Sequence, residues 1–204
     1  MRFNLVNGWV AQKLLFKRDL VRKPVKLGRF RALWPLLWQR RFLMPLVEPK
    51  GIYCFYSSKL VRELAKLIDG RSCLEIGAGD GTLARFLADE GVKVTATDDH
   101  SWQQSISFPE DVRRMDARQA LRHFRPEVVR CSWPPPGTAF EREVFKTPSV
   151  QQYVVIASED ETAAGNWADY RAQTAFDFER DPWFSRLMLP PEIRPAVYVF
   201  TRRG

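Results

Sequence analysis

The chain has 204 residues, of which 45% are hydrophobic, and this size and composition fit one globular domain with a sizeable core. Its net charge of +8 is uneven: residues 1–60 carry 13 Lys and Arg against Asp19 and Glu48, whereas residues 61–204 carry 19 against 22 acids. No run of 18 apolar residues occurs, so we expect no membrane span, and the apolar content excludes a disordered chain.

Residues 1–56 are predicted to form a basic, aromatic, mainly helical extension in front of a domain that spans residues 57–204. The extension holds Trp9 and Trp38 among its Lys and Arg residues. One interpretation is a cap that packs its aromatic side chains over the domain and leaves its charges in water. In another, residues 1–50 bind nucleic acid, an anionic membrane surface or another acidic partner. A cleaved organelle-import peptide is also compatible with the Arg-rich start, although this segment contains no Ser.

The three cysteines, Cys54, Cys73 and Cys131, show neither the spacing of a zinc site nor that of a disulfide framework. Cys73 and Cys131 fall in apolar segments, where a thiol packs as a small apolar group. The cysteine pattern therefore predicts a reducing, cytoplasmic environment, with no metal site.

From residue 57 the chain alternates between helical and extended patterns. Ser57 or Ser58 is a suitable N-cap for a helix whose apolar residues share one face and which Gly70 ends. The segments that follow are predicted as a strand at 72–76, a helix at 83–90, and strands at 92–97, 111–115, 127–131 and 152–157. This alternation predicts an α/β fold of three layers, a doubly wound and mostly parallel sheet with helices on both faces.

The C-terminal part departs from the alternation. A helix is predicted at 167–178, and two strands at 183–189 and 196–202 are separated only by a proline-containing turn at 190–195. Strands joined by a short turn pair antiparallel. We therefore expect the sheet to end in an antiparallel hairpin.

The most informative segment is Leu-Glu-Ile-Gly-Ala-Gly-Asp-Gly-Thr at residues 74–82, where a strand meets a helix through three alternate glycines. Glycine tolerates positive φ and lets a ligand approach the backbone at the start of a helix. A tight turn without a ligand has the same pattern. However, Asp98 ends the next predicted strand, 21 residues beyond Gly77, where nucleotide-binding βαβ units place a carboxylate against the ribose hydroxyls.

Two nucleotides fit such a unit, a dinucleotide such as NAD and S-adenosylmethionine. The dinucleotide pattern requires a small residue at position 82, where this chain has Thr82. Glu75, two residues before the first glycine, is a poor neighbour for a pyrophosphate and a suitable one for a cationic amino acid. These residues resemble the first motif of the class I S-adenosylmethionine-dependent methyltransferases, an acidic residue followed by x-G-x-G-x-G, and Asp98 matches their second motif.

The resemblance implies a seven-stranded sheet and S-adenosylmethionine as cofactor, with S-adenosylhomocysteine as product. It also implies that an acid such as Asp116 contacts the adenine. The loop from Ser132 to Gly137 is similar to the family's Pro-Pro-aromatic loop at the methyl-transfer site, although Trp133 separates Ser132 from the prolines. The residues predicted to contact the cofactor are Glu75, Gly77, Ala78, Gly79, Asp80, Gly81, Asp98, Asp99, Asp116, Ala117 and Ser132.

Candidates for catalysis are Ser132, whose carbonyl or hydroxyl can hold an acceptor, Trp133, which can stack on it, and His100 as a base. Each has a purely structural alternative in the core or the pocket wall. The acceptor is predicted to contact Tyr53, Tyr56, Trp102, Trp133 and Pro134. No spacing typical of metal-dependent methyltransferases is present.

The sequence favours a metal-independent transfer of a methyl group to an O or N atom of a small molecule, plausibly a specialised metabolite. A methyltransferase that holds nucleic acid or protein through the basic extension is the second hypothesis. A methyltransferase-like binding protein without catalytic activity is the third. The oligomeric state is not predicted.

Overall fold

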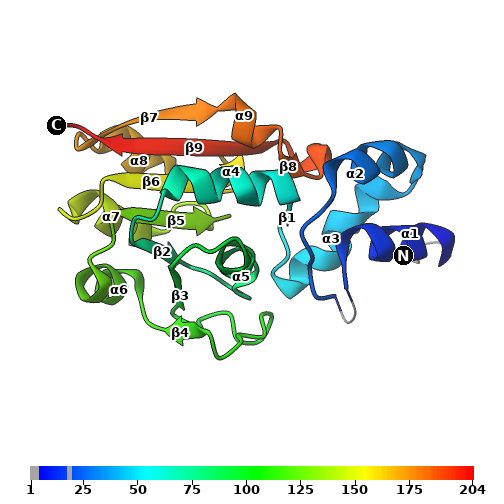
Figure 1. The fold of residues 1–204 in the computed structure, drawn as a ribbon, viewed down its shortest axis with the longest axis horizontal. Helices are drawn as coiled ribbons and strands as arrows, with labels where there is room; N and C mark the ends of the chain where they lie inside the picture. The colour runs from blue at the N-terminus through cyan, green and yellow to red at the C-terminus, as the bar shows by residue number, and fades with distance from the viewer. Residues whose placement is uncertain (1–4, 18–19) are drawn as a thin grey trace.

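The computed structural model describes residues 5–17 and 20–204, and expectations for residues 1–4 and 18–19 lie outside this part of the chain. A seven-stranded sheet with helices on both faces forms one half, and the N-terminal helices lie beyond one end of its strands (Figure 1). None of the helices in the described ranges is long and apolar enough to cross a membrane.

The strand order of the large sheet is β4-β3-β2-β5-β6-β9-β7. Its strands are β2 (Cys73–Ile76), β3 (Val94–Asp98), β4 (Val112–Arg114), β5 (Val128–Ser132), β6 (Gln152–Ser158), β7 (Phe176–Asp181) and β9 (Pro195–Arg202). The pairs among β2 to β6 are parallel, and β9 is antiparallel to both β6 and β7. The predicted mostly parallel sheet with an antiparallel C-terminal pair is confirmed.

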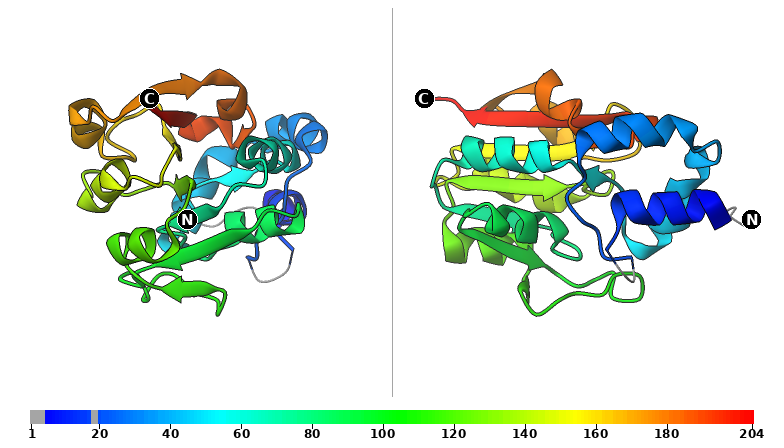
Figure 2. Two further views of the ribbon diagram at one scale, coloured as in Figure 1. Left: turned by 60° about the vertical axis from the view of Figure 1, so that its left-hand side comes forward. Right: turned by 45° about the vertical axis from the view of Figure 1, so that its right-hand side comes forward.

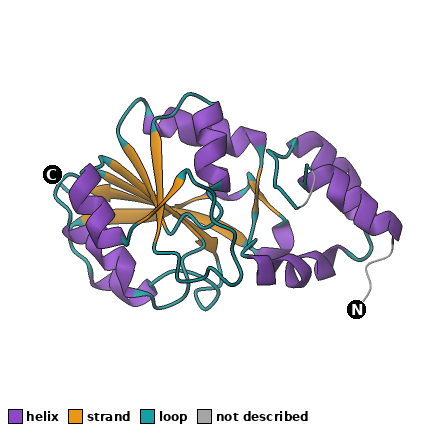
Figure 3. Ribbon diagram, turned by 90° about the horizontal axis from the view of Figure 1, so that it is seen from below, coloured by secondary structure: helices purple, strands orange, loops and turns teal. Residues whose placement is uncertain are grey.

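Helices cover both faces of this sheet, as Figures 2 and 3 show from other directions. The helices are α4 (Ser58–Ile68), α5 (Thr82–Asp89), α6 (Ala117–Phe124), α7 (Arg142–Lys146), α8 (Trp167–Ala172) and α9 (Pro182–Ser185). Strand residues alternate between two cores: Leu74 and Ile76 pack with α6, α7 and α8, whereas Cys73 packs with α4, α5 and α9. This period of two follows from the geometry of a β-strand.

The N-terminal extension is helical, as predicted, and has a small core of its own. It contains α1 (Leu5–Leu15), α2 (Leu27–Leu33), α3 (Leu43–Val47) and three short 3₁₀ turns, of which η1 is Trp34–Leu36. Phe30 and Trp34 are buried and stacked, and this core closes on Phe55 and Leu189 of the small antiparallel pair β1 (Phe55–Tyr56) and β8 (Met188–Leu189).

The expectation that the extension buries its aromatic side chains is therefore right for Phe30 and Trp34. It is wrong for Trp9 and Trp38, which are 64% and 70% exposed. The extension needs only one face of each short helix for its core. The opposite faces are left in solvent.

The C-terminal prediction needs a correction. Residues 176–178, predicted as the end of a helix, begin strand β7, and residues 183–189, predicted as a strand, lie mostly in α9 and β8. The alternation in Phe176, Phe178 and their polar neighbours is that of an edge strand against β9. Asp181 then caps α9 by accepting hydrogen bonds from the backbone of Trp183 and Phe184. The antiparallel pair thus exists, but a long connection joins its strands.

Candidate functional site

The glycine-rich turn joins β2 to α5 and exposes backbone toward the carboxyl ends of the strands. Gly77, Gly79 and Gly81 all have positive φ, between 55° and 65°, a conformation that favours glycine. The Gly81 amide donates to the Ala78 carbonyl, which closes the turn before α5 begins at Thr82. A Cβ at Gly79 would meet only the tip of Ile106, at 3.8 Å. Position 79 is therefore open to a ligand.

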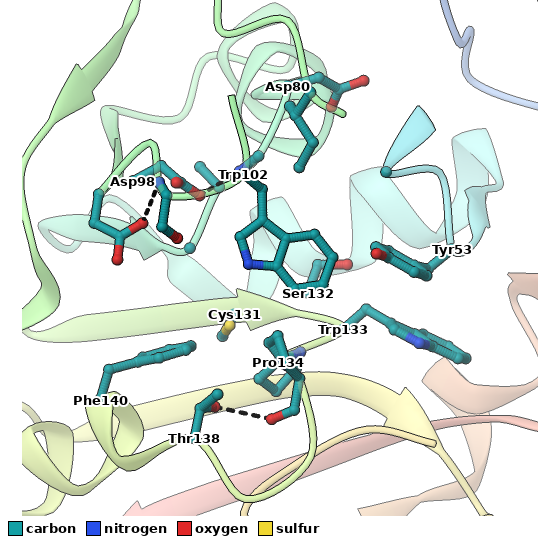
Figure 4. Close-up of a pocket in the computed structure, with 18 of the residues that line it drawn as sticks. Tyr53, Asp80, Asp98, Trp102, Cys131, Ser132, Trp133, Pro134, Thr138 and Phe140 are labelled. Atoms are coloured by element: carbon teal, nitrogen blue, oxygen red, sulfur yellow. Dashed lines mark hydrogen bonds between the residues drawn. The ribbon is translucent and has the colours of Figure 1, made fainter. Parts of the chain in front are cut away.

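A cavity of about 220 Å³ lies where the carboxyl ends of β2, β3 and β5 meet the loop after β4 (Figure 4). In sheets of this kind ligands bind at this edge, beside the point where the strand order reverses, here between β2 and β5. The predicted site residues that line it are Tyr53, Tyr56, Gly77, Ala78, Gly79, Asp80, Asp98, Asp99, Trp102, Asp116, Ala117, Ser132, Trp133 and Pro134.

The carboxylate of Asp98 connects the glycine-rich turn with the loop that follows β3. One of its oxygens accepts a hydrogen bond from the Gly79 amide and the other from the His100 amide, both at 2.9 Å. Asp116 ends the connection from β4 and caps α6 by accepting from the Gln119 amide at 2.9 Å. Both carboxylates thus lie at fixed positions on the cavity wall, on the side of the glycine turn.

The N-terminal extension contributes Arg22, which the sequence did not single out. Its guanidinium forms an ion pair with Asp80 at 2.6 Å and donates to the Cys54 carbonyl at 3.0 Å. Burial opposes the charge of Arg22, but the combined interactions with Asp80, Tyr56 and Cys54 outweigh it, and the pKa of Arg22 is raised. Its Nε, which is buried, has no hydrogen-bond partner among the described residues. Arg22 therefore lines the cavity as a buried cation whose terminal nitrogens are held by Cys54 and Asp80.

A chain of small polar groups crosses the cavity wall between the extension and β5. The Tyr56 and Ser132 hydroxyls are 2.7 Å apart, and the Cys54 thiol is 3.8 Å from the same Ser132 oxygen. Burial is the main cause that raises the pKa of Tyr56 well above 10. The Tyr56 phenol is therefore protonated at neutral pH and supplies a hydrogen bond rather than acting as a base.

Aromatic rings form the opposite wall. Trp133, with a φ of 59°, turns back at the end of β5 and lies parallel to Tyr53, with ring centroids 6.4 Å apart. In Figure 4 the Trp102 indole projects across the pocket between Asp98 and Tyr53. Phe140 lies below, close to Gly77. This arrangement suits a flat, mostly apolar acceptor.

Glu75 lies elsewhere than predicted. Its side chain is buried on the α5 side of the sheet and does not line the cavity. The reason is strand alternation: Glu75 pairs in register with Arg130, so both side chains project from the same face, and their charged groups are 3.3 Å apart. The Glu75 carboxylate neutralises a buried arginine. Glu75 is thus not among the residues that line the cavity, and its contact with a ligand stays a prediction.

His100 and Gly81 also fall outside the cavity lining. The His100 ring stacks on Phe108, with centroids 4.0 Å apart, so it belongs to a loop wall and is not placed as a base. Gly81 is the N-cap of α5, and a Cβ there would lie 2.7 Å from Val112. Its role is to let the helix start pack closely against β4.

Several lining residues were not predicted from the sequence: Arg22, Gly51, Cys54, Ser101, Ile106, Met115, Cys131, Pro135, Thr138 and Phe140. Pro135 lies inside the predicted Ser132–Gly137 loop, and Thr138 and Phe140 follow it closely, so a slightly longer loop would have included them. Nothing near Arg22 in the sequence indicates its position. In the described ranges no cluster of three or more His, Cys, Asp and Glu side chains is placed to hold a metal ion.

No protein-family model and no curated protein sequence matches this chain. Solved structures do match. The CcbJ methyltransferase from Streptomyces caelestis is 17% identical, with 72% of this chain and 89% of that chain covered and a TM-score of 0.48. Magnesium protoporphyrin IX methyltransferase from Synechocystis with bound SAM is 12% identical, with 86% and 94% covered and a TM-score of 0.49. The 23S rRNA methyltransferase ErmE is 21% identical, with 72% and 68% covered and a TM-score of 0.41.

The order of the strands in the large sheet identifies the fold. Numbered along the chain, the seven strands of the large sheet run 3-2-1-4-5-7-6 with the seventh antiparallel, and a glycine-rich turn follows the first. The chain has the Rossmann-like, seven-stranded fold of the class I methyltransferases.

Proposed function

We propose that this protein is an S-adenosylmethionine-dependent methyltransferase that acts on an O or N atom of a small molecule. The observation that carries the proposal is the convergence of the glycine-rich turn, Asp98, Asp116 and the Ser132–Gly137 loop on one cavity. Four separate strand ends supply these elements. A turn without a ligand would not require that convergence.

The residues at the cavity fit the cofactor in two respects. Gly77 and Gly79 leave a cradle that a side chain at position 79 would partly fill. Arg22 lines the same cavity with a positive charge, and a cation at this position fits an anionic group such as the α-carboxylate of an amino acid. In this proposal Asp98 accepts hydrogen bonds from the ribose hydroxyls and Asp116 lies toward the adenine.

When bound, S-adenosylmethionine supplies a methyl group that its sulfonium has already activated. The protein then has to position the acceptor and exclude water. Ser132, held by Tyr56, offers a hydroxyl to the acceptor atom, while Trp133, Tyr53 and Trp102 surround its apolar part. Because no histidine lines the cavity in the described part of the chain, an acceptor that reacts as a neutral amine or an acidic hydroxyl fits best.

A small acceptor is favoured by the place of the extension. The extension supplies Arg22, Gly51, Tyr53, Cys54 and Tyr56 to the cavity lining, so it would restrict the room for a larger substrate. The rival hypothesis, a nucleic acid or protein held by the basic extension, and a binding protein without turnover both predict the same cofactor pocket. The first predicts that nucleic acid or protein becomes methylated, and the second predicts that no acceptor is methylated.

Calorimetric titration with S-adenosylhomocysteine tests the cofactor, with NAD as the competitor. We expect S-adenosylhomocysteine to bind and NAD to give no heat. A chain that binds NAD alone, or neither ligand, contradicts the proposal. Transfer of a radioactive methyl group is then measured with pooled phenols and amines, with RNA and with protein. Labelling of RNA or protein alone supports the rival acceptor, and cofactor binding without any labelling supports a binding protein.

A further inference from the structure

The N-terminal extension holds most of the exposed large apolar side chains of the described structure. Trp9 is 64% exposed, Leu36 72% and Trp38 70%. The other exposed members of this set on the extension are Val6, Leu20, Val21, Leu33 and Leu46. Outside the extension, the described residues of this kind are only Trp102, at the cavity, and Trp183. Exposed apolar groups concentrated in one segment indicate an interaction surface.

These side chains are not needed for the folding of the extension. In α1 the buried residues are Asn7, Ala11, Leu14 and Leu15, whereas Trp9 and Lys13 lie on the outer face, where the Lys13 ammonium is 5.7 Å from the Trp9 ring. The core of the extension is complete without the outer face. The outer residues therefore add only the cost of exposing apolar surface in water.

Cations surround the same apolar groups. Arg29, Arg31 and Arg41 are exposed, and none forms an ion pair with another described residue. Residues 1–50 contain 12 Lys and Arg but only Asp19 and Glu48 as acids. The segment thus combines exposed Trp and Leu side chains with three exposed arginines that form no ion pair with a described residue.

Both kinds of residue lie at one end of the molecule. Figures 1 and 2 place the start of α1, the end of α2 and the turn η1 at the end opposite the C-terminus, away from the sheet. Trp9 belongs to α1, Leu33 ends α2, and Leu36 belongs to η1. These exposed residues therefore belong to elements at one end of the molecule.

We propose that this end of the extension docks on the surface of an anionic lipid bilayer, with Trp9, Leu36 and Trp38 at the level of the headgroups. Tryptophan favours the interface between membrane and water, and each Lys or Arg near an anionic surface adds attraction. Exposed aliphatic side chains favour a bilayer over nucleic acid, because proteins bind nucleic acid mainly through cations and stacked aromatic rings and not through leucine. The inference does not depend on the proposed methyl transfer.

The test is co-sedimentation of the full chain with vesicles of phosphatidylcholine alone and of phosphatidylcholine mixed with phosphatidylglycerol. We expect binding to the mixed vesicles only. The double variant Trp9→Ser/Trp38→Ser should have an affinity for the mixed vesicles that is lower by about tenfold or more. The double variant Arg29→Glu/Arg31→Glu should lose at least as much affinity. Trp183→Ser is the matched control, because Trp183 is 43% exposed but lies on the domain, and it should bind as the unchanged chain does.

Thermal unfolding and cofactor binding, measured on each variant, show that the fold is retained. Failure of the unchanged chain to bind the mixed vesicles overturns the proposal. Equal weakening by Trp183→Ser does so too, because the surface would then not be specific to the extension. Tight binding to an RNA oligonucleotide, with none to vesicles, assigns the cations to nucleic acid instead.

Discussion

Arg22 and Asp80 join two parts of the chain that lie 58 residues apart. The Arg22 guanidinium, from the N-terminal extension, is 2.6 Å from the carboxylate of Asp80 in the glycine-rich turn. Arg22 is only 6% exposed, whereas the Asp80 side chain is 32% exposed, so the pair is shielded from water on the arginine side. The extension is thereby part of the cavity wall, and changes in it should affect the ligand.

Substitution Arg22→Met should weaken the binding of S-adenosylhomocysteine about tenfold or more, since a buried charged hydrogen bond to the ligand's carboxylate would be lost. The affinity for methylthioadenosine, which lacks the amino acid part, should fall much less. Calorimetry with both ligands separates the two. An equal loss for both ligands would mean that Arg22 only shapes the pocket.

The same substitution should lower the free energy of unfolding by about 2 kcal/mol, because Asp80 loses its partner and the Cys54 carbonyl its donor. Arg40→Met is the matched control. Arg40 pairs with Glu192 at 2.8 Å, but both side chains are about one third exposed, so its removal should cost below about 1 kcal/mol. Urea unfolding of the three proteins measures the difference.

Two glycines of the turn should respond differently to a side chain. Gly79→Val should abolish S-adenosylhomocysteine binding with a smaller loss of stability than at position 81, because Gly79 lines the cavity and a Cβ there would meet only Ile106, at 3.8 Å. Gly81→Ala should instead destabilise the fold, since its Cβ would lie 2.7 Å from Val112. Calorimetry and thermal unfolding of both variants check this. If Gly79→Val bound S-adenosylhomocysteine as tightly as the unchanged chain does, the proposed position of the cofactor at the turn would be wrong.

Asp98→Asn should reduce the affinity for S-adenosylhomocysteine by roughly 10- to 100-fold, since a carboxylate that accepts from ribose hydroxyls contributes about 1.5–3 kcal/mol. Asp89→Asn, at the exposed end of α5, should leave the affinity unchanged. Competition binding with S-adenosylhomocysteine measures both. Equal affinities in the two variants would place the ribose elsewhere.

Glu75 and Arg130 should behave as a structural pair. Glu75→Gln leaves the buried Arg130 without a counter-charge and should cost about 3–5 kcal/mol of stability. The double variant Glu75→Leu/Arg130→Met should recover most of this loss, because it replaces both charges by apolar groups. Denaturant unfolding tests the pair. A Glu75→Gln protein of normal stability that fails to bind S-adenosylhomocysteine would restore Glu75 to the ligand site.

Stability should depend on pH through Glu141, a buried carboxyl that accepts from Tyr153 at 2.5 Å and also from Tyr170. Burial outweighs these bonds and raises the pKa of Glu141 to about 7. Glu141 therefore binds its proton more tightly in the folded state than in the unfolded state. This contribution to stability is fully present below the unfolded pKa of 4.5 and is lost as the pH rises through about 7. Glu141→Gln should remove this dependence. The free energy of unfolding is measured at pH 5 and pH 8 for the unchanged chain and for Glu141→Gln. An equal change between the two pH values in both proteins would contradict this role of Glu141.

The local sequence predicted the parallel half of the fold well. Strands around Leu74, Val94 and Val129 were found because buried strands alternate with capped helices, a signal contained in a few neighbouring residues. The C-terminal part was predicted less well. Residues 176–181 alternate weakly, and their strand conformation depends on pairing with β9, which lies later in the chain.

At the site, the sequence alone determined the glycine-rich turn, Asp98 and the loop at Ser132, because these residues end strands and the parallel topology gathers such ends at one edge. Only the tertiary structure decided that Glu75 faces Arg130 and that Arg22 reaches the cavity. The first depends on the register between two strands, the second on a contact across 58 residues. Local patterns carry no information about either, since both follow from how distant segments pack.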